Sequence, residues 1–203
     1  MSVSIEFETK KGLRGDLEAF ERILDALEKF ENIPIVKFGL YSLVFQLAMN
    51  VFLDVSSYCE RCGGKCCDYG FGIPVYEFDY KEIVNKLGVA KGISEIREGV
   101  DFRILERPCP YKRGWACGIH SFKPYACLSF PFSTEDEQKE VMDSYKGEGI
   151  PEFKLPEFCI AGKKVREIIK KIIDEMTKRL GREPSSRELY EELKSRFSYK
   201  LIT

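Results

Sequence analysis

Four cysteines fall within nine residues, in the stretch C-E-R-C-G-G-K-C-C that runs from Cys59 to Cys67. A two-residue spacing lets the chain curl so that the sulfurs of Cys59 and Cys62 face one ion. Two glycines follow, and glycine reaches the positive φ values that a sharply turning ligand loop needs. Cys66 and Cys67 are adjacent, and adjacent side chains of an extended chain point to opposite sides. The stretch therefore predicts a metal-binding loop, with either two metal centres or one centre and a spare thiol.

Four further cysteines follow and bring the total to eight. Residues 1–11 lack the apolar segment of a secretory signal, so we expect a cytoplasmic, reducing location, where clustered cysteines favour metal over disulfides. The chain has 32% charged residues but two Gln and three Asn, a usage typical of thermophiles. Because intracellular proteins of hyperthermophiles can carry disulfides, structural disulfides among some of the eight cysteines remain the alternative.

The cysteines continue in a longer pattern of fixed order and spacing. After the opening cluster come C-P-Y at Cys109 and C-G-I-H-S-F-K-P-Y-A-C-L-S-F-P from Cys117 to Pro131. This pattern resembles the YkgJ-like cysteine-cluster proteins, described as zinc- or iron-chelating. Their pattern is C-x2-C-x3-C-C, then C-P, then C-x-I-Y-x-x-R-P-x-x-C-R-x-F-P. The resemblance covers Cys59 to Pro131 and implies metal or iron–sulfur binding.

Three positions depart from the family pattern. His120 stands where the pattern has Tyr, and Lys123 and Leu128 stand where it has Arg. Any role of those arginines in holding a substrate or partner is therefore in doubt for this chain. His120 lies three residues after Cys117 and could complete a Cys3His zinc site. The aromatic residue of the family at this position instead favours a packing or hydrogen-bonding imidazole beside the site.

The cysteines number enough for two complete sites. Seven fall on the family pattern, and we expect each to be a ligand or to lie beside one. Cys159 follows an irregular, proline-containing segment and precedes a helix, and eight is the number that two four-thiolate sites need. We therefore predict that Cys159 closes the second site and that Cys66 and Cys67 are divided between the two sites. The predicted metal ligands are Cys59, Cys62, Cys66, Cys67, Cys109, Cys117, Cys127 and Cys159.

The kind of metal is predicted from the arrangement of the thiols. A structural zinc ribbon usually has two well-separated C-x2-C pairs, and this chain has one. A compact run with scattered further thiols is more typical of iron–sulfur ligation. We therefore predict an iron–sulfur cofactor, of the [4Fe-4S] type, in one or two copies, with Zn²⁺ as the alternative. A redox-active dithiol is disfavoured, because two glycines and two further thiols follow where thioredoxin-like folds have a helix.

Two functions from different classes fit these features. The first is electron transfer or a redox-linked modification with a redox partner; the second is a zinc-stabilised module that binds a protein or RNA partner. The chain has no Walker loop, dinucleotide fingerprint or nucleophile elbow, and no catalytic residue is identified. The 32 basic and 33 acidic residues give no overall attraction to nucleic acid or anionic membrane. Acidic residues also interrupt the basic side of the helix after Cys159, which disfavours nucleic-acid binding.

The predicted fold class is α+β and mainly helical, with helices enclosing an irregular, metal-bound cysteine core. We expect a single domain over residues 1–203. Its first part, 1–58, should hold a strand and a helical hairpin. Its second part, 59–159, should form the cysteine core, and its third part, 160–203, the C-terminal helices.

Hydrophobic periodicity predicts the elements within these parts. A strand is expected at 3–7 and a helix at 16–30. The apolar run 38–55 is nearly long enough to span a membrane, but Gln46 and Asn50 interrupt it, so we expect a buried core helix. Further predictions are a helix at 79–87 ended by Gly88, a short helix within 89–100, a strand at 102–105, a polar surface segment at 133–149, an amphipathic helix ended by Gly181 and a last helix capped by Ser185 and Glu188.

Overall fold

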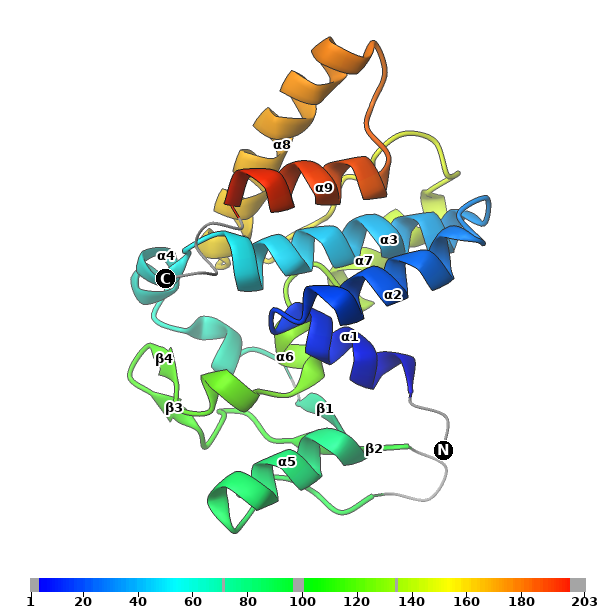
Figure 1. Ribbon diagram of the computed structural model, residues 1–203. Helices are drawn as coiled ribbons and strands as arrows, with labels where there is room; N and C mark the ends of the chain where they lie inside the picture. Colours follow the sequence, from blue (N-terminus) through cyan, green and yellow to red (C-terminus); the bar gives the residue numbers. More distant parts are fainter. Residues whose placement is uncertain (1–3, 71, 97–100, 134, 198–203) are drawn as a thin grey trace.

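The computed structural model describes residues 4–70, 72–96, 101–133 and 135–197. Most of the described chain is helical, and two small antiparallel sheets accompany the helices (Figure 1). The mainly helical α+β class is therefore confirmed. The elements are α1 (Ile5–Leu13), α2 (Leu17–Glu28), α3 (Pro34–Leu47), the π-helical turn η1 (Ala48–Phe52), α4 (Ser56–Arg61), the 3₁₀ turn η2 (Lys65–Cys67), β1 (Ile73–Tyr76), α5 (Glu77–Leu87), β2 (Phe102–Leu105), β3 (Lys112–Arg113), β4 (Ala116–Cys117), the 3₁₀ turn η3 (His120–Phe122), α6 (Tyr125–Ser129), α7 (Glu135–Ser144), α8 (Ile160–Leu180) and α9 (Ser186–Phe197).

The N-terminal segment forms a helix where a strand was expected. The predicted strand at 3–7 is wrong, because the chain enters α1 at Ile5; its first residue lies outside the described part. The side-chain oxygen of Ser4 accepts a hydrogen bond from the N–H of Phe7 at 3.2 Å, and serine is a preferred N-cap. Helix α2 packs so closely on α1 that it leaves no room for a side chain on Gly12. The cap and this packing outweigh a short alternating pattern.

The helical hairpin is confirmed. Asp16 caps α2 through its side chain, which accepts the N–H of Ala19 at 2.9 Å. Helix α3 begins at Pro34, and α2 and α3 run side by side (Figure 1). By length and composition Pro34–Phe52 could cross a membrane, but 56% of its most apolar window is buried inside the protein. Other helices cover this segment, as expected for a core helix.

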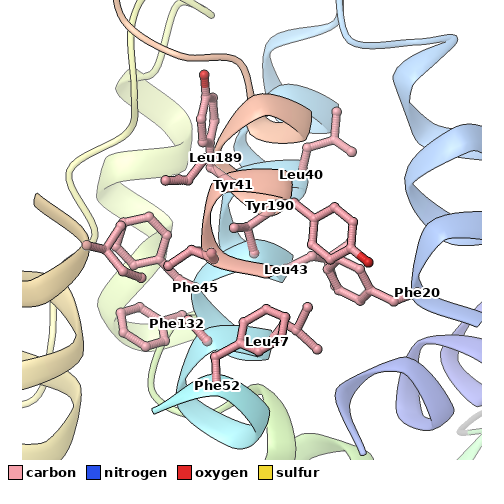
Figure 2. Close-up of a cluster of buried hydrophobic side chains, with 14 of the residues drawn as sticks. Phe20, Leu40, Tyr41, Leu43, Phe45, Leu47, Phe52, Phe132, Leu189 and Tyr190 are labelled. Carbon is pink, nitrogen blue, oxygen red and sulfur yellow. The ribbon is translucent and has the colours of Figure 1, made fainter. Parts of the chain in front are cut away.

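The larger hydrophobic core surrounds α3 (Figure 2). Phe20 of α2 and Tyr190 of α9 pack on one another with ring centroids 5.2 Å apart. The rings of Phe45 of α3 and Phe132 pack with their centroids 5.4 Å apart. The hydroxyl of Tyr41 donates to the C=O of Pro184 at 2.8 Å, which ties α3 to the start of α9. From Leu40 to Leu47 helix α3 is buried on all sides, which fits its apolar sequence.

The C-terminal helices follow their sequence signals. Helix α8 ends at Gly181, which has a φ of 71°, a left-handed conformation that glycine adopts without steric cost. Before α9, the N–H of Ser185 donates to Glu188 at 2.7 Å and the N–H of Glu188 donates to Ser185 Oγ at 3.2 Å. Both helices and the capping box are therefore confirmed.

This capping box predicts a small, pH-dependent loss on Glu188→Gln. A hydrogen bond from Arg182 and then one from the Ser185 N–H hold the pKa of Glu188 at about 2. Because the folded-state pKa lies below the ordinary value of 4.5, this stabilisation is present above pH 4.5 and is lost as the pH falls toward 2. The pair is partly exposed, so we expect the free energy of unfolding near pH 7 to fall by about 0.5 to 1 kcal/mol. Urea unfolding of variant and wild type should give curves that converge toward pH 2; a difference that does not change with pH would contradict the prediction.

A second, smaller core lies around the β1–β2 sheet and α5, at the bottom of Figure 1. In this sheet Ile73 lies opposite Leu105, and Ile83 of α5 packs against the same cluster. Gly88, with a φ of 76°, ends α5 as predicted. The strand at 102–105 is also confirmed. Cys109 belongs to this core, and Cys67, Cys117 and Cys127 pack against it.

One expectation for the connecting segments is wrong. Residues 89–96 form turns and no helix, and 97–100 lie outside the described residues. Ile93 instead forms a β-bridge to Leu105, beside the β1–β2 sheet. The segment 133–149 is polar and largely exposed where it is described, as expected. Helix α7 forms within it, and the buried side-chain amide of Gln138 donates to the C=O of Pro131 and of Lys154. That segment is thus tied to the fold.

Candidate metal centre

The opening cysteine cluster is built from two short helical turns joined by two glycines. Cys59 lies on α4 and Cys62 follows its last residue. Gly63 and Gly64 have φ values of 68° and 63°, so both adopt the left-handed conformation that the sequence predicted for this loop. The N–H of Gly64 donates to the C=O of Cys59 at 3.3 Å. The turn η2 then carries the last two cysteines of the cluster.

The loop lies directly against the β3–β4 hairpin. A Cβ on Gly64 would come within 2.4 Å of the C=O oxygen of Trp115, whereas a Cβ on Gly63 would meet nothing within 4 Å. Trp115 lies between the two hairpin strands, and Cys117 ends the second strand. Glycine at position 64 therefore allows the close approach that brings Cys117 toward the opening cluster.

Gly64→Ala and Gly63→Ala form a matched pair for testing this contact. Both substitutions put a side chain at positive φ, which costs about 1 to 2 kcal/mol each. The alanine at 64 must also displace the hairpin backbone at Trp115. We expect Gly64→Ala to lose more stability in urea unfolding and to bind less metal by elemental analysis than Gly63→Ala. Equal effects of the two variants would contradict the role of the close approach.

The eight thiols differ in whether they pack against the smaller core. The second thiol group packs against the smaller core and consists of Cys67, Cys109, Cys117 and Cys127. Within it the N–H of Cys109 donates to the C=O of Cys67 at 2.8 Å, and the two side chains share a hydrogen bond that, with burial, raises the pKa of Cys109. The first thiol group lies outside that core and consists of Cys59, Cys62, Cys66 and Cys159.

The first thiol group joins distant parts of the chain. Helix α4, which carries Cys59, packs against α8, and Cys159 is the N-cap of α8. Burial raises the pKa of Cys159 to about 11, and the charges of Cys59 and Cys62 act in the same direction. These three thiols are therefore within electrostatic range of one another.

Cys66 and Cys67 lie where the two groups meet. A hydrogen bond with Cys67 lowers the pKa of Cys66, against the opposing effects of burial and of Cys127, Cys159 and Cys59. The neighbours of Cys66 thus come from both groups. Cys67 in turn bonds with Cys109 as well as with Cys66.

None of the eight cysteines forms a disulfide. Across the described residues, no three His, Cys, Asp or Glu side chains come close enough together to hold a metal ion. The sulfurs are therefore neighbours that do not surround a common point, and metal ligation by each cysteine stays a prediction. The donor set itself fits, because thiolates are the ligands that zinc and iron–sulfur clusters take from proteins.

Backbone N–H groups support three of the sulfurs. The N–H of Gly162 donates to Cys159 Sγ at 3.4 Å. Burial raises the pKa of Cys117, and a hydrogen bond from the N–H of Ile119 opposes that effect. Cys109 receives a similar bond from the backbone of Tyr111. Such bonds favour the thiolate form and orient a sulfur ligand.

Two cations lie among the thiols. Burial raises the pKa of Cys127 to about 12, and the charges of Lys123 and then Arg107 oppose this rise. Lys123 stands where the family pattern has Arg, so the departure keeps the charge. The Nε atom of Arg107 is buried without a hydrogen-bond partner. Because such a donor is costly to leave unpaired, an anionic metal–thiolate group would fit beside it. Sequence reasoning missed Arg107, although its place two residues before Cys109 was an available signal.

Aromatic rings pack together at Phe158, the residue before Cys159. Phe158 packs on Tyr69 with ring centroids 4.7 Å apart and stacks with Phe130 at 6.2 Å. Apolar rings limit water at a metal site. His120 begins η3 with its side chain exposed, and the charge of Lys123 lowers its pKa. Its role beside the site stays a prediction.

One comparison with known proteins supports metal binding by the cysteine segment. Residues 58–146 match the family model CxxCxxCC, described as "Putative zinc- or iron-chelating domain". No curated protein and no solved structure matches the chain. The matched residues include seven of the eight cysteines and leave Cys159 outside. The resemblance to the YkgJ-like family is confirmed, because residues 58–146 match the model of the CxxCxxCC zinc- or iron-chelating domain.

Proposed function

We propose that this protein binds iron–sulfur clusters, of the [4Fe-4S] type, and works in electron transfer or in a redox-linked modification with a redox partner. The observation that carries the proposal is that all eight cysteines are free and that four of them pack against the smaller core. Four thiolates are the ligand number of one such cluster.

Each thiol group would supply one site. Cys59, Cys62, Cys66 and Cys159 would hold the first cluster, and Cys67, Cys109, Cys117 and Cys127 the second. The clusters would supply one-electron chemistry when bound. The chain's own residues would orient the sulfurs through backbone N–H groups, balance the charge of the thiolates and limit water. A reducing compartment belongs to the proposal, because it keeps the thiols free.

Zinc is the second candidate, and the smaller core favours it. That core has few buried apolar residues and includes a cysteine, a composition typical of folds that a structural zinc stabilises. The protein would then be an interaction module for a protein partner. An RNA partner is disfavoured, because Lys164 and Lys171 on α8 both pair with Glu167, and a helix that binds nucleic acid normally keeps charge of one sign.

Metal analysis of the full chain, purified without oxygen, separates the two candidates. We expect iron and sulfide, a brown colour and visible absorbance that bleaches reversibly with dithionite. A colourless protein with stoichiometric zinc, unchanged by dithionite, would overturn the iron–sulfur proposal and support the zinc module. A wild-type protein without either metal would overturn both.

A further inference from the structure

The short helix α6 carries Cys127 and depends on other elements for its position. It has five residues, and its N-cap residue, Pro124, makes no side-chain capping bond. The N–H of Cys127 bonds to Pro124 C=O at 2.9 Å within the same turn. A helix this short has too few internal hydrogen bonds to be stable alone. Its place is therefore set by the groups that bind its two ends.

Asp79 of α5 holds the N-terminal end. Its side chain is fully buried. One carboxylate oxygen accepts the N–H of Tyr125 at 3.1 Å, and the other accepts the N–H of Tyr76 at 3.3 Å. Lys10 of α1, itself buried, donates to the first oxygen at 2.6 Å. One carboxylate thus joins α1, the start of α5 and the start of α6.

Asn50 of η1 holds the C-terminal end. Its side-chain amide donates to the C=O of Leu128 at 2.8 Å and to the C=O of Gln46 at 2.7 Å. π-helical turns are uncommon and are frequent at functional sites. Both ends of the helix that carries Cys127 are therefore fixed by polar side chains from the surrounding helices.

Stability alone does not account for the pair of Lys10 and Asp79. Replacing a buried ion pair with apolar residues of similar volume is often neutral or stabilising. An apolar side chain at position 79, however, could not accept the N–H groups of Tyr76 and Tyr125. What the carboxylate adds is therefore position, because it joins the backbone at Tyr76 to the backbone at Tyr125.

We infer that Asp79, paired with Lys10, is a positioning residue that places α6, and with it the sulfur of Cys127, for metal binding by the second thiol group. The inference rests on the proposed metal site. Asp79 lies outside the cysteine cluster and acts on the site through the backbone N–H of Tyr125.

Three variants of the full chain test this role. Lys10→Met with Asp79→Leu removes the acceptor without leaving a buried charge. Lys10→Met with Asp79→Asn keeps an oxygen that can accept the N–H of Tyr125. Tyr41→Phe is the control, because it removes a buried hydrogen bond to Pro184 on another part of the fold. Metal per chain is measured on protein purified without oxygen. The rate at which iodoacetamide modifies Cys127, relative to Cys62, is measured by mass spectrometry on chelator-treated protein.

In the leucine variant we expect metal binding at the second group to weaken by about 10- to 100-fold, the usual effect of losing a group that orients a ligand. Cys127 should be modified faster while the rate at Cys62 stays the same. The asparagine variant should regain most of the metal, and Tyr41→Phe should behave as wild type. Wild-type metal content and an unchanged Cys127 rate in the leucine variant would overturn the inference, and so would equal acceleration at Cys62.

The two proposals can fail separately. If the wild type binds no metal, the proposed function fails, and the Cys127 rates still decide whether Asp79 positions α6. If the leucine variant does not fold, amide hydrogen exchange of the wild type replaces it. The N–H of Tyr125 must then be protected, because an N–H that exchanges freely is not held by Asp79.

Discussion

Replacing Cys159 with serine is expected to lower bound metal by about one centre per chain and to leave the other centre in place. Cys159 is buried at the start of α8, within electrostatic range of Cys59 and Cys62. Loss of one thiolate opens a closed four-thiolate site, and the free energy of metal binding goes with it. Elemental analysis of protein purified without oxygen checks the prediction.

Cys127→Ser is the matched control for this variant. It should remove the other centre, and the double variant should bind almost no metal. If Cys159→Ser keeps its full metal content, or if the two single variants lose the same centre, the two-site assignment is wrong.

Lys10→Met alone is expected to lower the free energy of unfolding by about 3 to 5 kcal/mol, the cost of leaving a buried charge without its partner. The carboxylate of Asp79 is fully buried, and Lys10 is the cation that bonds to it. Lys11→Met is the control, because Lys11 pairs with Glu8 at the surface and such pairs contribute about 0 to 1 kcal/mol. Urea unfolding of the two variants and the wild type measures both losses.

The loss in Lys10→Met should also depend on pH. Burial raises the pKa of Asp79, although Lys10 opposes the rise, so removal of Lys10 raises this pKa further. A carboxyl group whose pKa is higher in the folded state favours folding when it is protonated. The loss should therefore be complete above the folded-state pKa and shrink as the pH falls below it. Unfolding both proteins after chelator treatment removes the contribution of metal release, and a loss that is constant with pH would contradict the explanation.

Sequence reasoning succeeded where two local signals agreed. The capping Asp16 precedes a clear helical period, and Gly181 follows one, so α2 and the end of α8 were predictable. It failed at Ile5–Phe7, where three alternating residues are too few to separate strand from helix, and the cap at Ser4 was the better signal. The expected single domain stays a prediction.

The sequence predicts the site as a list of cysteines, which stays a prediction, and says much less about their arrangement. Family spacing identified seven thiols, and an irregular lead-in pointed to Cys159. Which thiols lie near one another depends on which chain segments pack together. Cysteines that do not pack against the smaller core lie both before and after, along the sequence, the cysteines that do. Asp79 is the clearest omission, because its partner Lys10 lies 69 residues away and nothing near position 79 marks it as buried.

The position of Cys159 beside α4 has a consequence for the stability of the whole chain. A metal bound by both Cys59 and Cys159 would close a loop of about 100 residues in the folded state. The loop includes the whole smaller core and α7. Because a metal that binds the folded state alone stabilises it according to its free concentration, the melting temperature of this protein should rise with metal supply. The fraction of folded protein would then depend on the concentration of free metal around it.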